Sequence, residues 1–70
     1  MKTVTYNGKE YTVPKWTRCM ATDEDGCIYA YSKDAEVSDV CVGWSCCGKF
    51  KFIAEDYTIT DWMNSKESFE

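Results

Sequence analysis

Val4-Thr5-Tyr6-Asn7-Gly8-Lys9-Glu10-Tyr11-Thr12-Val13 is the stretch that decides the fold class, because it has the pattern of a β-hairpin. Asn7 and Gly8 suit the two central positions of a type I′ turn, both of which need a positive φ. A two-residue loop sets Tyr6 opposite Lys9 and, in the same register, Lys2 opposite Val13. One face of the hairpin then carries Val4, Tyr6, Tyr11 and Val13. Pro14 cannot donate a ladder hydrogen bond, so the second strand is expected to end before it.

Residues 19–31 predict a second hairpin, with its turn at Asp23 to Gly26. The Asp-Gly pair supplies the backbone angles that such a turn needs. After the turn, Ile28 and Ala30 share one face of the strand, and Tyr29 and Tyr31 share the other. Both faces are apolar, which indicates either a central strand or a strand with an exposed aromatic face.

The remainder of the chain completes the expected fold. Residues 33–39 are polar and are expected to form a loop. Residues 40–54 predict a third hairpin, in which Cys46-Cys47-Gly48 is a three-residue loop with Gly48 in the left-handed position. This register sets Trp44 opposite Phe50 and Val42 opposite Phe52, with Ala54 on the same face. Residues 58–69 predict a short helix, begun by a capping-box-like Thr58 to Asp61, with Ile59, Trp62, Met63 and Phe69 near one face.

The sequence therefore predicts an α+β fold in one domain, residues 1–70, dominated by β-structure. We expect an antiparallel sheet of about five to six strands, built from three hairpins, with one short C-terminal helix. The chain has three Trp, five Tyr and three Phe, which can form an aromatic-rich core. A domain of this size has no room for a deep enclosed pocket.

The formal net charge is −4, and acidic residues concentrate between positions 19 and 48. Phosphate-backbone binding requires clustered Lys and Arg, so direct binding to nucleic acid is not expected. The acidic region suits a partner with a basic surface, or serves solubility alone. No apolar run approaches the length of a membrane span, and no secretory signal begins the chain, so a cytoplasmic location with reduced thiols is expected.

The residue types argue against catalysis and against a cofactor. The chain has no His, which removes the commonest general acid–base and the commonest transition-metal ligand. The five cysteines lack the Cys-x₂-Cys spacing of a zinc site. Asp23-Glu24-Asp25-Gly26 is interpreted as a turn because the later ligands of a calcium loop do not follow. We therefore predict a protein that is not an enzyme and that holds no cofactor or metal.

Several short motifs follow one another along the chain. They are Tyr6-Asn7-Gly8-Lys9, Val13-Pro14 with Trp16, Asp23 to Gly26, Gly43-Trp44, and Asp61-Trp62 with Ser65. This order resembles that of the short uncharacterised accessory proteins of tailed bacteriophages, although Lys66 stands where that family usually carries Leu. The resemblance implies no activity and no ligand. The resemblance implies a small bacteriophage protein in the host bacterial cytoplasm, where such proteins commonly bind and redirect host factors.

The aromatic excess is the feature that points to a binding surface. Tyr and Trp are enriched at interface hot spots, and acidic groups beside them steer a basic partner. The predicted partner-binding residues are Tyr29, Tyr31, Asp23, Glu24, Asp25 and Trp16. The alternative is that the two tyrosines belong to the core.

The first functional hypothesis is a protein that binds and inhibits or redirects a host protein, for example one of a defence system. The alternative is a protein that sequesters a small ligand or a nucleotide signal between stacked aromatic rings. A structural role in the virion and self-association are both left open by the sequence.

Overall fold

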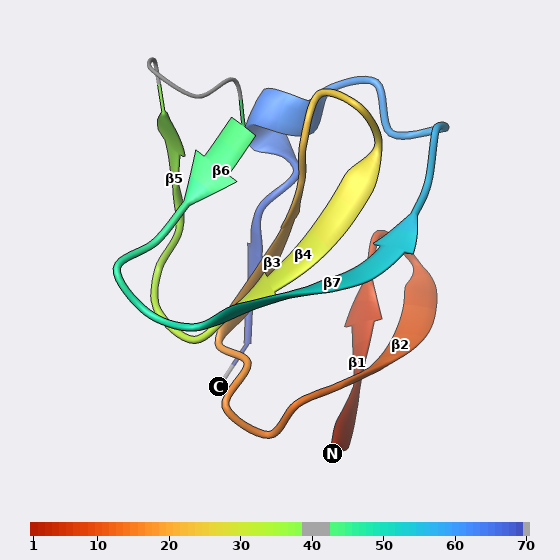
Figure 1. Cartoon of the computed structure of the whole chain (residues 1–70). Helices are drawn as coiled ribbons and strands as arrows, with labels where there is room; N and C mark the ends of the chain where they lie inside the picture. Colours follow the sequence, from red (N-terminus) through yellow and green to blue (C-terminus); the bar gives the residue numbers. More distant parts are fainter. Residues whose placement is uncertain (39–42, 70) are drawn as a thin grey trace.

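The computed structural model describes residues 1–38 and 43–69 and is dominated by antiparallel β-structure (Figure 1). Its elements are β1 (Lys2–Tyr6), β2 (Lys9–Val13), β3 (Cys19–Thr22), β4 (Cys27–Tyr31), β5 (Glu36–Ser38), β6 (Gly43–Ser45), β7 (Phe50–Glu55), the 3₁₀ turn η1 (Trp62–Asn64) and β8 (Glu67–Ser68). A four-stranded sheet has the order β7-β4-β3-β8, while β1–β2 and β5–β6 form separate two-stranded ribbons. The predicted β-dominated, antiparallel character is thus confirmed, but the strands form one four-stranded sheet and two ribbons rather than a single sheet of about five to six strands.

The β1–β2 hairpin has the register expected from its turn residues. Tyr6 pairs with Lys9 and Lys2 pairs with Val13. Asn7 and Gly8 both have a positive φ, of 51° and 79°. The local turn chemistry is therefore sufficient to set this ribbon, because a two-residue loop leaves only one register that buries the apolar face.

The β3–β4 hairpin is also confirmed, with Gly26 at a φ of 87° in its turn. The backbone N–H of Asp23 donates to the carbonyl of Cys27 at 2.9 Å, and that of Gly26 donates to the carbonyl of Asp23 at 3.0 Å. β4 lies between β7 and β3, so it is a central strand. Its two apolar faces are explained by layers that pack on both sides of the sheet (Figure 1).

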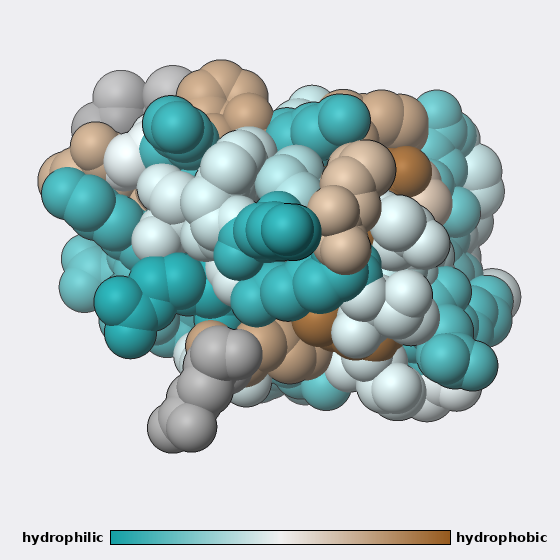
Figure 2. Space-filling view, turned by 90° about the horizontal axis from the view of Figure 1, so that it is seen from below, coloured by the Kyte–Doolittle hydropathy of each residue, from teal (hydrophilic) through white to brown (hydrophobic). Residues whose placement is uncertain are grey.

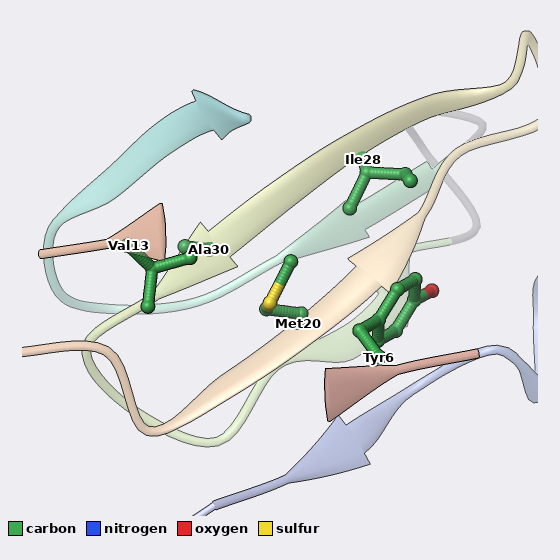
Figure 3. Packing of buried hydrophobic residues seen from close by; sticks show 5 residues of the cluster. All are labelled: Tyr6, Val13, Met20, Ile28 and Ala30. Carbon is green, nitrogen blue, oxygen red and sulfur yellow. The ribbon is translucent and has the colours of Figure 1, made fainter. Parts of the chain in front are cut away.

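The first core lies between the β1–β2 ribbon and one face of the four-stranded sheet. Its fully buried side chains are Tyr6, Val13, Met20, Ile28 and Ala30, which Figure 3 shows in the space between ribbon and sheet. The Tyr6 hydroxyl is satisfied within this core, 2.7 Å from Oγ1 of the buried Thr22. The predicted apolar face of the first hairpin is the face that packs here.

The second core lies on the opposite face of the same sheet, under the β5–β6 ribbon. Its buried side chains are Cys19, Ala21, Tyr31 and Ala35, with Tyr29, Trp44 and Cys46 packed against them. The alternation along β3 and β4 sends neighbouring residues into different cores. All four residues of β3 are consequently buried.

The predicted hairpin over residues 40–54 is wrong in the part that the structure describes. β6 pairs with β5, with Trp44 opposite Val37, whereas β7 pairs with β4. The segment expected to be a loop, residues 33–39, therefore contains strand β5, while Val40 and Val42 lie outside the described residues. Gly48 does not adopt a positive φ, and a side chain there would meet the Ser32 hydroxyl. Residues 46–49 connect two layers rather than two neighbouring strands.

A β-bulge at Ile53 changes which face of β7 is buried. Tyr29 pairs with Phe52 and Ile28 pairs with Ala54, so Ile53 has no opposite residue. Ile53 and Ala54 both pack on the first core, while Phe50 and Phe52 lie on the other side of the sheet. The expectation that Ala54 shares a face with the two phenylalanines is therefore wrong, because the extra residue shifts the alternation.

The predicted C-terminal helix over residues 58–69 is also wrong. Only the single turn η1 forms, and Asp61 makes no side-chain cap for it. The hydroxyl of Ser65 donates to the carbonyl of Trp62 at 2.7 Å and accepts from the backbone N–H of Thr22 at 2.9 Å. This tether turns the chain into extended β8 along β3, where the Phe69 N–H donates to the Arg18 carbonyl at 2.6 Å. Sheet pairing thus replaces the helical hydrogen bonds.

The face seen from below in Figure 2 is mostly hydrophilic, with hydrophobic residues visible only in small, separate groups. No helix among residues 1–38 and 43–69 is long and apolar enough to cross a membrane.

Candidate functional site

Aromatic side chains gather where β4 meets the edge strand β7. The ring of Tyr29 lies 5.8 Å from that of Phe52 and 6.2 Å from that of Phe50, both edge to face. Phe50 is 66% exposed and Phe52 is 47% exposed, so these rings do not serve the core. We call the surface formed by Tyr29, Trp44, Phe50 and Phe52 the aromatic face.

A hollow of about 320 Å³ opens beside these rings, where strands of two layers meet. Its described lining residues are Asp23, Tyr29, Tyr31, Trp44, Ser45, Cys46 and Phe50. The rings come from three strands: β4, β6 and β7. The lining includes the Asp23 carboxylate and contains no Lys or Arg among the described residues.

Trp44 is held in place by three hydrogen bonds. Its indole N–H donates both to the carbonyl of Thr22, at 2.9 Å, and to that of Trp62, at 3.0 Å. Its backbone N–H donates to Oδ1 of Asp23 at 3.0 Å. The indole therefore has a fixed orientation, which is the condition for a preorganised binding wall.

The Asp23 carboxylate connects the β3–β4 turn to β6. Burial raises the pKa of Asp23 and the charge of Asp25 adds to the rise, whereas the hydrogen bond from the Trp44 N–H lowers it. Gly43 permits the close approach of the two segments. A Cβ at Gly43 would lie 2.9 Å from Oδ1 of Asp23, and its φ of 152° is one that other residues rarely adopt.

Tyr29 and Tyr31, which were predicted to act together, have different surroundings. Tyr31 is only 3% exposed, and its hydroxyl donates to the carbonyl of Trp44 at 3.3 Å. Burial raises the pKa of this hydroxyl above its ordinary value. Tyr29 is half-buried and packs on both phenylalanines. Both tyrosines line the hollow, but Tyr31 is a buried residue of the second core and Tyr29 is half-buried.

The remaining predicted residues lie around the hollow or away from it. Glu24 and Asp25 are exposed in the turn that follows Asp23, and Asp25 Oδ1 accepts from the backbone N–H of Cys27 at 3.1 Å. Trp16 is half-buried in the connection between β2 and β3 and is not one of the residues that line the hollow.

Sequence reasoning missed Phe50 and Phe52 as site residues. Their alternation is visible in the sequence, but it predicts one face of a hairpin, with Trp44 opposite Phe50 and Val42 opposite Phe52. The signal that distinguishes them is their position next to Lys49 and Lys51, because an alternating aromatic–lysine strand is typical of a sheet edge.

Other candidate sites in the described part of the chain are less coherent. One hollow is lined mostly by polar groups of residues 58–61 and by Asn7, Asn64 and Glu67. Another brings Arg18 and Lys33 together with Asp34 beside Phe69. The described residues hold no group of three or more His, Cys, Asp or Glu side chains arranged to bind a metal ion. Cys19, Cys27, Cys46 and Cys47 are free thiols, and Cys41 lies outside the described residues.

Comparison with known proteins adds no identity, since no protein family, curated protein or solved structure gives a significant match to the chain.

Proposed function

We propose that this protein binds another protein through the aromatic face and the acidic turn beside it. The observation that carries the proposal is the exposure of Phe50 and Phe52 on an edge strand of a domain that has two other apolar cores. Exposed aromatic clusters of this kind are typical of interaction sites, and aromatic side chains supply much of the binding energy at interfaces.

The charge around the aromatic face favours a basic partner surface. Asp23, Glu24 and Asp25 follow one another in the turn next to the hollow, and the whole chain has a net charge of −4. Carboxylates at the rim of an interface accelerate the encounter with a positively charged surface, while the rings provide the desolvated contact.

The proposed partner is a host bacterial protein that becomes inhibited or redirected, as for a bacteriophage accessory protein in the host cytoplasm. This part rests on the order of short motifs that ends in Asp61-Trp62 with Ser65. A component of a bacterial defence system fits the same reasoning.

The hypothesis of nucleotide sequestration receives less support from the site. A phosphate group in the hollow would face the Asp23 carboxylate, and no described lining residue carries a positive charge. Phosphate recognition ordinarily relies on Arg, Lys or backbone N–H groups.

Affinity capture from a bacterial lysate tests the proposed function. The immobilised chain is compared with the Phe50→Ser and Phe52→Ser variants, and retained proteins are identified by mass spectrometry. Met63→Ser is the matched control, because Met63 is 56% exposed but lies in η1, outside the aromatic face.

We expect one specific protein to be retained by the wild type and by Met63→Ser and to be lost from both phenylalanine variants. Retention should also weaken as salt is raised, because rim charges are screened. Equal retention by all four chains would contradict the proposal.

A further inference from the structure

We propose that the hollow lined by Tyr29, Tyr31, Trp44, Phe50 and Asp23 binds an organic cation, the guanidinium or alkylammonium head of an Arg or Lys side chain. The identity of the donor as a partner protein rests on the proposed function. The binding of the cation itself follows from the lining of the hollow.

Four aromatic rings line the hollow and come from three different strands. The face of an aromatic ring carries negative charge density and attracts a cation, most strongly for Trp and Tyr. Trp44 is fixed by its two indole hydrogen bonds, and Tyr31 is fixed by its bond to the Trp44 carbonyl. The rings are therefore held in place before a ligand arrives.

The carboxylate of Asp23 adds full negative charge to the same wall. Burial raises the pKa of Asp23, and repulsion from the nearby Asp25 carboxylate adds to the rise. A cation in the hollow would reduce this repulsion, whereas an anion would increase it. The aromatic rings and the carboxylate thus favour the same sign of ligand.

The protein's own lysine on β7 is directed elsewhere. Lys51 pairs with Ala30, and Ala30 belongs to the core on the opposite side of the sheet. Since directly opposed residues of an antiparallel pair share a face, Lys51 projects away from Phe50 and from the hollow.

The size of the hollow suits a head group rather than a complete cofactor. Its volume of about 320 Å³ lies at the lower end of the range for small-molecule sites. Phe50 and Phe52 continue beyond its rim as exposed surface, where the rest of a partner can pack. A basic side chain inserted into the hollow would anchor such a partner.

A titration monitored by NMR tests the cation site directly. N-acetyl-arginine methylamide is added to the isotopically labelled chain, and the neutral citrulline analogue serves as an isosteric control. We expect saturable shifts for the backbone amides of Trp44 and Ser45 and for the Phe50 ring with arginine, and none with citrulline.

Matched variants locate the interaction. Asp23→Asn removes the charge but keeps an oxygen for the Trp44 N–H, and Glu10→Gln makes the same change at an exposed residue of β2, outside the acidic turn. Phe50→Leu removes an exposed lining ring, and Tyr57→Leu removes an exposed ring that neither lines the hollow nor belongs to the aromatic face. We expect Asp23→Asn and Phe50→Leu each to weaken arginine binding by about two- to fivefold, with no change in either control variant.

Equal shifts with arginine and citrulline, or no shift with either, would overturn the cation site. Unchanged arginine binding in Phe50→Leu, which removes only an exposed ring, would do the same. If a partner is captured through the phenylalanines but arginine causes no shift, the cation site fails and the proposed function stands. If arginine binds as expected but no protein is captured, the cation site stands and the proposed function fails.

Discussion

Tyr31 and Phe50 are paired across β4 and β7, yet their replacement by Ala should have very different effects on stability. Tyr31 is 3% exposed and belongs to the second core, whereas Phe50 is 66% exposed. The comparison separates the structural part of the aromatic cluster from its binding part. It also tests the two alternatives that the sequence leaves open for Tyr31, namely a place in the binding surface or a place in the core.

The expected magnitudes follow from burial. A buried aromatic side chain removes about 150–250 Å² from water, and truncation of such a ring to Ala costs about 3–5 kcal/mol. Tyr31→Ala also removes the hydroxyl that donates to the Trp44 carbonyl. Phe50 keeps only about a third of its surface covered, so Phe50→Ala should cost about 1 kcal/mol.

The measurement is thermal unfolding by circular dichroism, with denaturant unfolding for the free energies. For a domain of this size, each kcal/mol shifts the melting temperature by about 4–8 °C. Tyr31→Ala should therefore lower the melting temperature by about 12 °C or more, or prevent folding altogether. Phe50→Ala should lower it by a few degrees.

A pair of similar, small shifts would refute the assignment of Tyr31 to the core. A large loss of stability in Phe50→Ala would show that its ring is structural rather than available for binding. Tyr31→Phe provides the control, because it keeps the ring and removes only the hydroxyl, at a cost of about 1 kcal/mol.

Three further predictions concern the connections between layers. Gly26→Ala should lower the free energy of unfolding, measured with denaturant, by about 1–3 kcal/mol, and by more than Gly8→Ala does. Both glycines have a positive φ, but only at Gly26 would the added Cβ meet a ring, that of Tyr57 at 2.9 Å. Equal losses would show that the ring contact is unimportant. Ser65→Ala should cost about 1–3 kcal/mol by leaving the buried Thr22 N–H without its acceptor, and hydrogen exchange at that amide should accelerate. The hydrogen bond from the Thr58 hydroxyl lowers the pKa of Asp56, and the Thr58 N–H and Lys9 lower it further. The ionised Asp56 carboxylate therefore stabilises the fold above its unfolded pKa of about 3.9, and this stabilisation is lost as pH falls through the lower folded pKa. Melting curves should therefore show acid destabilisation that is weaker in Asp56→Asn, and parallel pH profiles would contradict this assignment.

The two N-terminal hairpins could be predicted from the sequence because the residues that determine each hairpin lie in its own turn and strands. Asn7-Gly8 and the turn that ends at Gly26 fix both the position of the turn and the register of the strands beside it. The two apolar faces of β4 are also visible in the sequence at Ile28 and Tyr29, but the pattern leaves open whether the aromatic face is buried.

The second half of the chain could not be predicted because its pairing is not local. Cys46-Cys47-Gly48 has the composition of a hairpin turn, but it carries the chain from one layer to the edge of another. The apparent helix near Trp62 is replaced by a strand because Ser65 forms hydrogen bonds with residues far away in sequence. Periodicity contains no information about such partners.

Some residues of the candidate site could be grouped from the sequence. Asp23, Tyr29 and Tyr31 do line one hollow, and Phe50 lines it too. The bulge at Ile53 separates the face of Phe50 and Phe52 from that of Ala54. A single extra residue in a strand leaves little trace in the hydrophobic pattern. Trp16 is of a residue type that is enriched at interfaces, but it is not one of the residues that line the hollow.

The burial of every residue of β3 has a consequence for how this protein tolerates change. A substitution in Cys19–Thr22 disturbs one core or the other, so no position of that strand tolerates a change of side chain without a loss of stability. β7 has the opposite character, because Phe50, Lys51 and Phe52 are exposed and contribute little to either core. A chain with this division can acquire a new binding partner by changes along one edge while the strands that hold it together stay the same.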